Sequence, residues 1–136
     1  MNTRGKAYRN AILSTVTVDQ TDVRVIAVHI DRENDRRHQL RLMIELFLNL
    51  QPPCVLMGDL NTDAADPLIA SLLEQKDVAS PLHDSTANGS PRRTIDWIFT
   101  RGLKTISATL VENKASDHPC LKAELAPIVS GEAPMP

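Results

Sequence analysis

Apolar and polar residues follow two different periods along this chain of 136 residues. Residues 10–18 partly alternate and are rich in β-branched side chains, so they predict a strand. Residues 19–22, which read Asp-Gln-Thr-Asp, indicate a turn. Residues 23–30 predict a second strand, and its more uniformly apolar character is typical of burial on both faces. We expect these two strands to form an antiparallel hairpin.

A period of three to four residues predicts one strong helix over residues 35–50. Its apolar stripe consists of Leu40, Met43, Ile44, Phe47 and Leu48. Polar and basic side chains take its other faces, namely Arg36, Arg37, Gln39 and Arg41. The proline pair at 52–53 ends this helix. A short buried strand over 54–57 and a loop over 58–66 should follow.

The second half of the chain predicts one short helix and three strands. Asp66-Pro67 is typical of an N-cap followed by proline at the first helical position, with the helix ending near Gln75. Residues 76–93 predict a loop. We expect strands at 94–100, 104–112 and 119–125, the first two joined as another antiparallel hairpin by Arg101-Gly102. The order of elements indicates an α/β fold with a mixed, mostly antiparallel sheet and helices on one face.

The charge balance argues against a protein that tracks long duplex DNA. The net charge is −2 and the pI is about 6.0, whereas such proteins carry a basic face that neutralises phosphates. A small or locally held phosphate substrate fits better. The dense basic groups are Arg32, Arg36, Arg37 and Arg41, with Arg92 and Arg93. The last two could hold a phosphate or form a solvated basic loop.

The two cysteines and the hydropathy of the chain limit its cellular setting. Cys54 and Cys120 make no disulfide framework, and their apolar contexts predict buried free thiols. Neither a signal-like N-terminus nor a run of roughly 20 apolar residues is seen in the sequence. A cytoplasmic location is the default, which a targeting segment upstream of Met1 would change.

Two carboxylates and an amide lie where apolar strands meet loops. Asp59 and Asn61 follow a buried strand across Gly58, and alternate residues of an extended segment point the same way. They form either one side of a reactive site or an Asx turn. Asp96 lies inside the apolar run 95–99, where an unpaired buried charge is costly. It therefore needs a His or Arg partner, unless it faces solvent.

Two histidines are the candidates for proton transfer. His118 precedes Pro119, which restricts it to extended geometry, and an acidic partner would fix its tautomer. The alternative is a surface loop that contains Asp117-His118 by chance. His29 lies near the end of an apolar strand, where a histidine is more often a satisfied core residue than a catalyst.

Three short motifs together resemble the C-terminal motifs of the endonuclease/exonuclease/phosphatase superfamily, the DNase I-like phosphodiesterases and phosphatases. They are Gly58-Asp59-Leu60-Asn61, Ile95-Asp96-Trp97-Ile98-Phe99 and Ser116-Asp117-His118-Pro119. The segments Asn10–Ser14 and Val28–Ile30 also resemble strands of that family, in the same order. The resemblance spans about residues 8–125. It implies a metal-dependent hydrolase whose substrate is a phosphoester: nucleic acid, lipid head group or small phosphate ester.

The resemblance also implies a role for each candidate residue. His118 would be the base, oriented by Asp96, while Asp59 would orient or activate the attacking water. Asn61 would hold a phosphate oxygen, and His29 would contact the phosphate or aid the leaving group. Asp117 would help to bind a divalent metal, Mg²⁺ or Mn²⁺.

The family fold is a two-layered α/β sandwich of two similar halves, and this chain resembles the C-terminal half, over residues 1–125 with a flexible tail at 126–136. The other half supplies the main metal-binding Glu, which neither Glu33 nor Glu45 matches. We therefore expect an incomplete ligand set, weak or no activity alone, and an exposed sheet face. A missing N-terminal half or self-association could cover that face. A non-catalytic binding module on the same scaffold is the alternative function.

Overall fold

The computed structural model describes residues 8–85, 94–112 and 114–129, which form two sheets and three helices. Strands β1 (Ala11–Val18) and β2 (Thr21–His29) pair antiparallel, as predicted. Strand β3 (Cys54–Asp59) joins β2 in parallel, and β4 (Asp96–Arg101) pairs antiparallel with β3. The four-stranded sheet thus has the order β1-β2-β3-β4, and its mixed, mostly antiparallel pairing confirms the predicted fold class.

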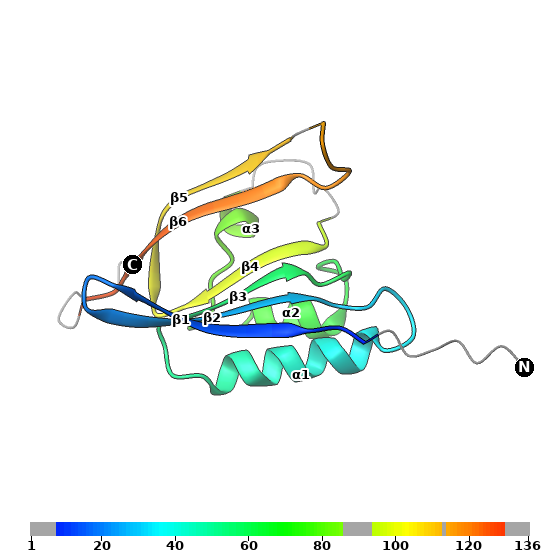
Figure 1. Cartoon of the computed structure of the whole chain (residues 1–136), viewed down its shortest axis with the longest axis horizontal. Coiled ribbons are helices and arrows are strands. Elements are labelled where there is room, and N and C mark those ends of the chain that lie inside the picture. Colours follow the sequence, from blue (N-terminus) through cyan, green and yellow to red (C-terminus); the bar gives the residue numbers. More distant parts are fainter. Residues whose placement is uncertain (1–7, 86–93, 113, 130–136) are drawn as a thin grey trace, which may run out of the picture.

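Helices α1 (Arg36–Asn49) and α2 (Pro67–Leu73) cover one face of this sheet (Figure 1). The predicted stripe of α1 supplies Leu40, Ile44 and Phe47 to the core. Helix α2 begins as predicted, because the Asp66 side chain accepts a hydrogen bond from the Leu68 N–H at 2.9 Å. The core consists of apolar side chains from both helices, from β2 to β4 and from the loops between them. Burial of these apolar stripes is what fixes the helices on the sheet.

A second, two-stranded sheet lies on the other side of the four-stranded sheet from α1 (Figure 1). It pairs β5 (Leu103–Val111) with β6 (Cys120–Pro127) in antiparallel fashion. The predicted hairpin between 94–100 and 104–112 is therefore wrong. Gly102 has a φ of 69°, which turns the chain out of the first sheet. Leu103 and Leu125 then pack against Val23 and Val55, so the base of this β5–β6 ribbon rests on the first sheet.

The segment predicted as a loop over 76–93 contains more structure than expected. Helix α3 (Pro81–Ser85) lies within it, and Ala79 exchanges backbone hydrogen bonds with Thr100 at 2.8 and 2.9 Å. Residues 86–93 lie outside the described part, and so does the expectation for Arg92 and Arg93. The prediction of two buried cysteines is half wrong. Cys54 is buried in the core, but Cys120 opens β6 opposite the exposed Val111 and is itself exposed.

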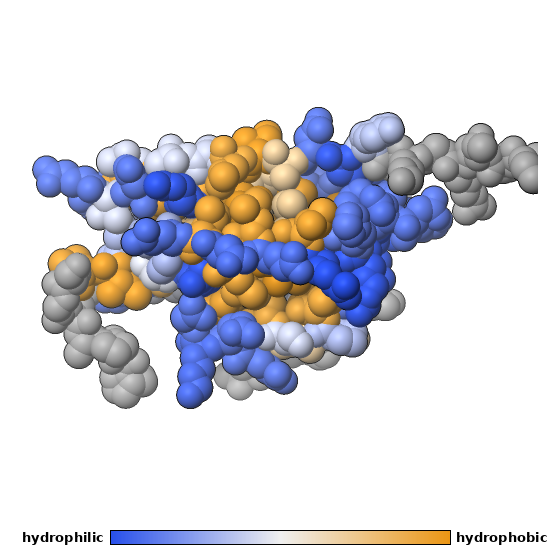
Figure 2. Space-filling view, turned by 90° about the horizontal axis from the view of Figure 1, so that it is seen from below, coloured by the Kyte–Doolittle hydropathy of each residue, from blue (hydrophilic) through white to orange (hydrophobic). Residues whose placement is uncertain are grey.

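Apolar side chains remain exposed on both faces of the first sheet. On the ribbon side, Ile12, Val16 and Met57 are 64%, 47% and 39% exposed, which agrees with the predicted open sheet face. On the α1 side, Figure 2 shows apolar side chains at the centre of the surface with polar ones across them. Leu42 on α1 is 45% exposed. No helix among the described residues is long and apolar enough to cross a membrane.

Candidate active site

The parallel pairing of β2 with β3 brings Asp59 to the site, and it depends on Gly58. This glycine has a φ of 137°, and a Cβ added there would lie 1.9 Å from the carbonyl oxygen of Val28. Since no side chain fits, glycine alone permits the two strands to approach at this point. Asp59 then follows as the last residue of β3, on the face that the ribbon overhangs.

Asp96 and His118 complete the centre of the site. Asp96 stands directly opposite Asp59 in the β3–β4 pairing. The Nδ1 atom of His118, which precedes β6, lies 2.8 Å from Oδ2 of Asp96 and 4.0 Å from Oδ2 of Asp59. The hydrogen bond to Asp96 and the negative charge of that carboxylate raise the pKa of His118 above its ordinary value. When Nδ1 carries the proton it donates to Asp96, and Nε2 is left free to exchange a proton.

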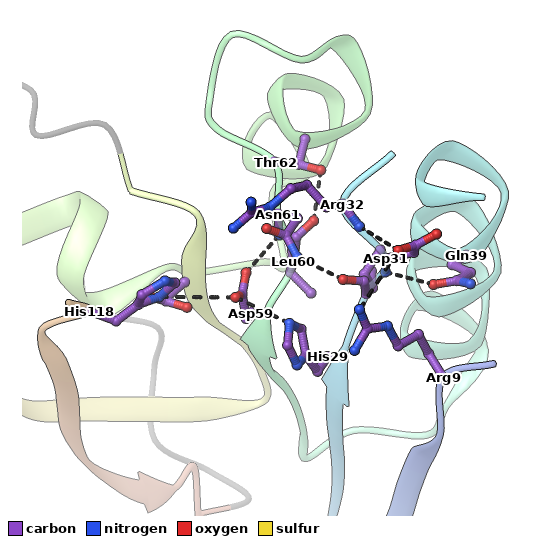
Figure 3. A network of polar contacts seen from close by, with 12 residues as sticks. Arg9, His29, Asp31, Arg32, Gln39, Asp59, Leu60, Asn61, Thr62 and His118 are labelled. Carbon is purple, nitrogen blue, oxygen red and sulfur yellow. Dashed lines mark hydrogen bonds and ion pairs between the residues drawn. The ribbon is translucent and has the colours of Figure 1, made fainter. Parts of the chain in front are cut away.

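His29 approaches Asp59 from the opposite side to His118 (Figure 3). Its Nε2 lies 3.4 Å from Oδ2 of Asp59, and its side chain is 58% exposed. The interpretation of His29 as a satisfied core histidine is therefore wrong. As the last residue of β2 it extends past the helix-covered core toward the open face.

Asn61 supports the site through its backbone and its side chain. Its φ of 45° lies in the left-handed region, which asparagine tolerates well. The Asn61 N–H donates to Oδ1 of Asp59 at 2.9 Å, and the side-chain amide donates to the Ile30 carbonyl at 2.7 Å. One N–H of the amide group remains for a ligand. The Asx-turn interpretation and the reactive one are thus compatible, because Asp59 forms the turn and still faces the site.

Asp117 differs from the other predicted residues because it is exposed and lies outside the central cluster. It acts on His118 at a distance, where its charge adds a minor contribution to the raised pKa. The atoms that converge belong to Asp59, Asp96 and His118, and one ligand atom from each lies within 4.8 Å of the others. Two carboxylates and an imidazole suit a divalent cation of the Mg²⁺ or Mn²⁺ kind. The two carboxylates therefore fit a metal, and the imidazole can be a third ligand only when its Nδ1 carries no proton.

A shallow cavity of about 550 Å³ adjoins this cluster. Its polar end contains His29, Asp59 and Asp96, and its apolar walls include Ile12, Met57 and Leu121. The cavity lies between the open face of the first sheet and the β5–β6 ribbon. The site is therefore a cluster of ionisable side chains at one end of a cavity with apolar walls.

The sequence of residues 2–118 matches the model of the endonuclease/exonuclease/phosphatase family. The chain belongs to this family. The family name covers nucleases and phosphatases, which are enzymes that hydrolyse phosphoester bonds, and the resemblance given by the three motifs is confirmed. A search among curated protein sequences finds no match.

Solved structures show the same fold as this family member. The human Nocturnin catalytic domain with bound sulfate has a TM-score of 0.70 and 18% identity, with 90% of this chain and 54% of that chain covered. D. rerio TDP2 complexed with a single-strand DNA product gives 0.69 and 15%, with 90% and 64% covered. An endonuclease/exonuclease/phosphatase from Bacteroides vulgatus gives 0.64 and 21%, with 88% and 56% covered. The chain thus spans little more than half the length of these proteins.

Several supporting residues of this family member were not predicted from the sequence. Gln39, placed only outside the apolar stripe of the helix, accepts a hydrogen bond from the Asp31 N–H at 2.8 Å and so fixes the loop after His29. Thr62 is buried at 3% exposure and accepts the indole N–H of Trp97 on its carbonyl. One feature of the sequence could have indicated Thr62 and Trp97. Each directly follows a predicted site residue, Asn61 and Asp96 respectively.

Proposed function

We propose that this chain carries the proton-transfer side of a metal-assisted phosphoester hydrolase. The observation that carries the proposal is the convergence of Asp59, Asp96 and His118 within 4.8 Å at the rim of a cavity. Two acids and an oriented imidazole are the groups that general acid–base hydrolysis requires. The family of the chain makes a phosphoester the matching substrate class.

In this proposal each side chain has a defined task in proton transfer or phosphate binding. Asp59 orients the attacking water, and Nε2 of His118 accepts its proton as the water oxygen bonds to phosphorus. Asp96 holds the imidazole in the required tautomer and stabilises it once it is charged. Asn61 donates its remaining amide N–H to a phosphate oxygen. His29, when protonated, gives a proton to the leaving oxygen as its bond to phosphorus breaks.

Asp59 and Asp96 would hold the divalent cation, Mg²⁺ or Mn²⁺, beside His118, whose Nδ1 keeps the proton that it donates to Asp96, and with Asp117 close by. Once bound there, such a cation would neutralise charge on the phosphoryl oxygens. The main metal-binding Glu that the resemblance assigns to the other half of the family fold is matched by neither Glu33 nor Glu45. For this reason we propose weak or no turnover for these 136 residues alone, with the substrate a nucleic acid, a lipid head group or a small phosphate ester. We also propose a cytoplasmic setting.

The test combines metal binding with hydrolysis of a nitrophenyl phosphodiester and the matching monoester. The wild-type chain is expected to bind Mn²⁺ and to turn over either ester slowly or not at all, with any rate removed by His118→Ala. Fast Mg²⁺-dependent cleavage that His118→Ala abolishes would contradict the proposed incompleteness. No Mn²⁺ binding at millimolar concentration would contradict the metal-assisted site itself.

The open sheet face favours a second candidate, a non-catalytic module that binds a partner. Ile12, Val16 and Met57 are exposed apolar residues on one face of the sheet. Contiguous surfaces of this kind mark interaction sites, and an isolated two-stranded ribbon is marginal in water. We propose that a complementary half-domain or a second copy covers this face. Light scattering after size exclusion should show either self-association that Ile12→Ser weakens or aggregation of a chain whose partner half is absent. A monodisperse monomer would contradict this proposal.

A further inference from the structure

Asp59 and Asp96 face each other directly at the end of the β3–β4 pairing. Like charges at opposite positions destabilise an antiparallel pair of strands. Both carboxylates nevertheless point to the same face and lie in one cluster with His118. The Leu60 N–H donates to the Ile95 carbonyl at 2.9 Å and continues the backbone pairing past the two carboxylates. A side-chain contact between the same segments would hold them further against this repulsion.

Trp97 makes such a contact from the opposite face of the sheet. Successive strand residues point to opposite faces, so Asp96 faces the open side while Trp97 is buried in the helix-side core at 2% exposure. The indole Nε1–H donates to the Thr62 carbonyl at 2.8 Å. This bond connects β4 to the loop that follows β3 and contains Asn61. It thus ties the strand that bears one carboxylate to the loop that begins at the other.

Both ends of this hydrogen bond are held in place. The Thr62 hydroxyl donates to the Leu60 carbonyl at 2.8 Å and accepts from Nη1 of Arg36 at 2.9 Å. The Trp97 ring stacks on Phe99, with ring centroids 5.0 Å apart and planes 12° from parallel. Because donor and acceptor are both fixed, the bond helps to set the distance between the two chain segments, together with the Leu60–Ile95 backbone hydrogen bond.

The placement of Arg36 agrees with this support of the loop. Arg36 is the first residue of α1, where the helix dipole disfavours a cation. Its Nη1 contacts the Thr62 hydroxyl and, at 3.4 Å, Oδ2 of Asp66. The side chain therefore braces the loop that follows Asp59 rather than the helix to which it belongs.

We propose that Trp97 is a positioning residue whose indole N–H, through Thr62, keeps Asp59 and Asp96 at the separation that a shared cation and His118 require. The inference rests on the proposed function in taking these carboxylates as the reacting groups. The Trp97–Thr62 hydrogen bond itself is present in the folded chain without any ligand. It can therefore be tested without metal or substrate.

The test is a double-mutant cycle between Trp97→Phe and Asp59→Asn, read as the urea midpoint of unfolding at pH 9. Phenylalanine keeps an aromatic ring against Phe99 but has no N–H. Asparagine keeps an acceptor for the Asn61 N–H but has no charge. Asp59→Asn shifts the urea midpoint by some amount in each background. That shift should be more positive in the wild-type background than in the Trp97→Phe background, by at least about 0.3 M urea. Without the indole bond the carboxylates already move apart, so less repulsion remains to be relieved.

Asp63→Asn is the matched control, because it removes the same charge from the same loop and keeps an acceptor for the Ala65 N–H. Its midpoint change should be equal in both backgrounds. Equal changes for Asp59→Asn as well would overturn the proposal. If Trp97→Phe does not fold, hydrogen exchange of the indole N–H, from the single tryptophan of the chain, replaces the cycle. Exchange should be slower in Asp59→Asn than in wild type, and an unchanged rate would overturn the proposal.

A separate measurement uses Mn²⁺ as the probe and links the contact to the site. Trp97→Phe should weaken Mn²⁺ binding by about tenfold, whereas Phe47→Leu, which disturbs the same core away from the loop, should leave it unchanged. Equal weakening by both variants would assign Trp97 a merely structural role. A wild-type chain that binds no Mn²⁺ would count against the proposed function, and the cycle would still decide the role of Trp97.

Discussion

On the helix side of the four-stranded sheet, Ile26, Leu56 and Phe99 are fully buried, whereas Ile12 and Met57 on the other face are 64% and 39% exposed. The buried face is closed by α1 and α2 and contains the main core. The other face is only partly covered by the β5–β6 ribbon and carries the charged cluster at its edge. Alternate residues of the same strands therefore form the apolar core on one face and the candidate site on the other.

This difference shows how stability and chemistry are divided in the chain. Leu56 and Met57 are neighbours in β3, as are Asp96 and Trp97 in β4, and each pair places one residue on each face. Substitutions on the helix side should change mainly the free energy of unfolding, with Trp97, which reaches the site loop through Thr62, as the exception. Substitutions on the other face should change metal and proton binding.

Phe47→Ala should produce the largest loss of stability, about 3–5 kcal/mol in the free energy of unfolding, because Phe47 is fully buried and its removal leaves a cavity. Met57→Ala on the open face is the control and should cost less than about 1 kcal/mol. Urea denaturation measures both. Similar losses for the two variants would show that the open face is covered after all.

Arg101→Met should cost about 1.5–3 kcal/mol, because hydrogen bonds from a charged donor to part-buried carbonyls are lost. Nη1 of Arg101 donates to the carbonyls of Phe47, Leu48 and Leu50 at 2.9–3.2 Å, at the C-terminal end of α1. The same denaturation experiment on Asp77→Asn is the control. Asp77 accepts from Nε of Arg101 but is 60% exposed, so its loss should be no more than about 0.5 kcal/mol.

The pKa of His118 should be above its ordinary value, and Asp96→Asn should lower it. A group with a raised pKa in the folded state stabilises that state most fully below its unfolded pKa. The contribution of His118 is therefore lost as the pH rises through the raised pKa. Solvent weakens this effect, because the side chain is one-third exposed. An NMR titration of the imidazole in wild type and Asp96→Asn decides the matter, and equal pKa values would contradict the Asp96 contact.

Local signals in the sequence were enough to predict much of the fold. The β1–β2 hairpin, α1 and the Asp66 N-cap each depend on residues close together in the chain. The pairing of β5 with β6 instead of β4 was missed, because it depends on the left-handed turn at Gly102 and on how the ribbon packs on a distant strand. Adjacent strands in the sequence are not always neighbours in a sheet.

The candidate site divides in the same way. The Asp96–His118 contact could be predicted, because three motifs together resemble a known family. The exposure of His29 could not, since a strand end gives no sign of whether it passes beyond the core. Gln39 and Trp97 were missed for a related reason: each lies in an element whose pattern predicts packing, and its hydrogen bond joins a loop far away in the sequence.

We propose above all that Asp59 and Asp96 hold one divalent cation beside His118. Isothermal titration of Mn²⁺ into the wild-type chain, Asp96→Asn and Asp63→Asn tests it most directly. We predict one ion per chain, with binding at least about tenfold weaker in Asp96→Asn and unchanged in Asp63→Asn. Equal binding in all three, or none in the wild type, would contradict the claim.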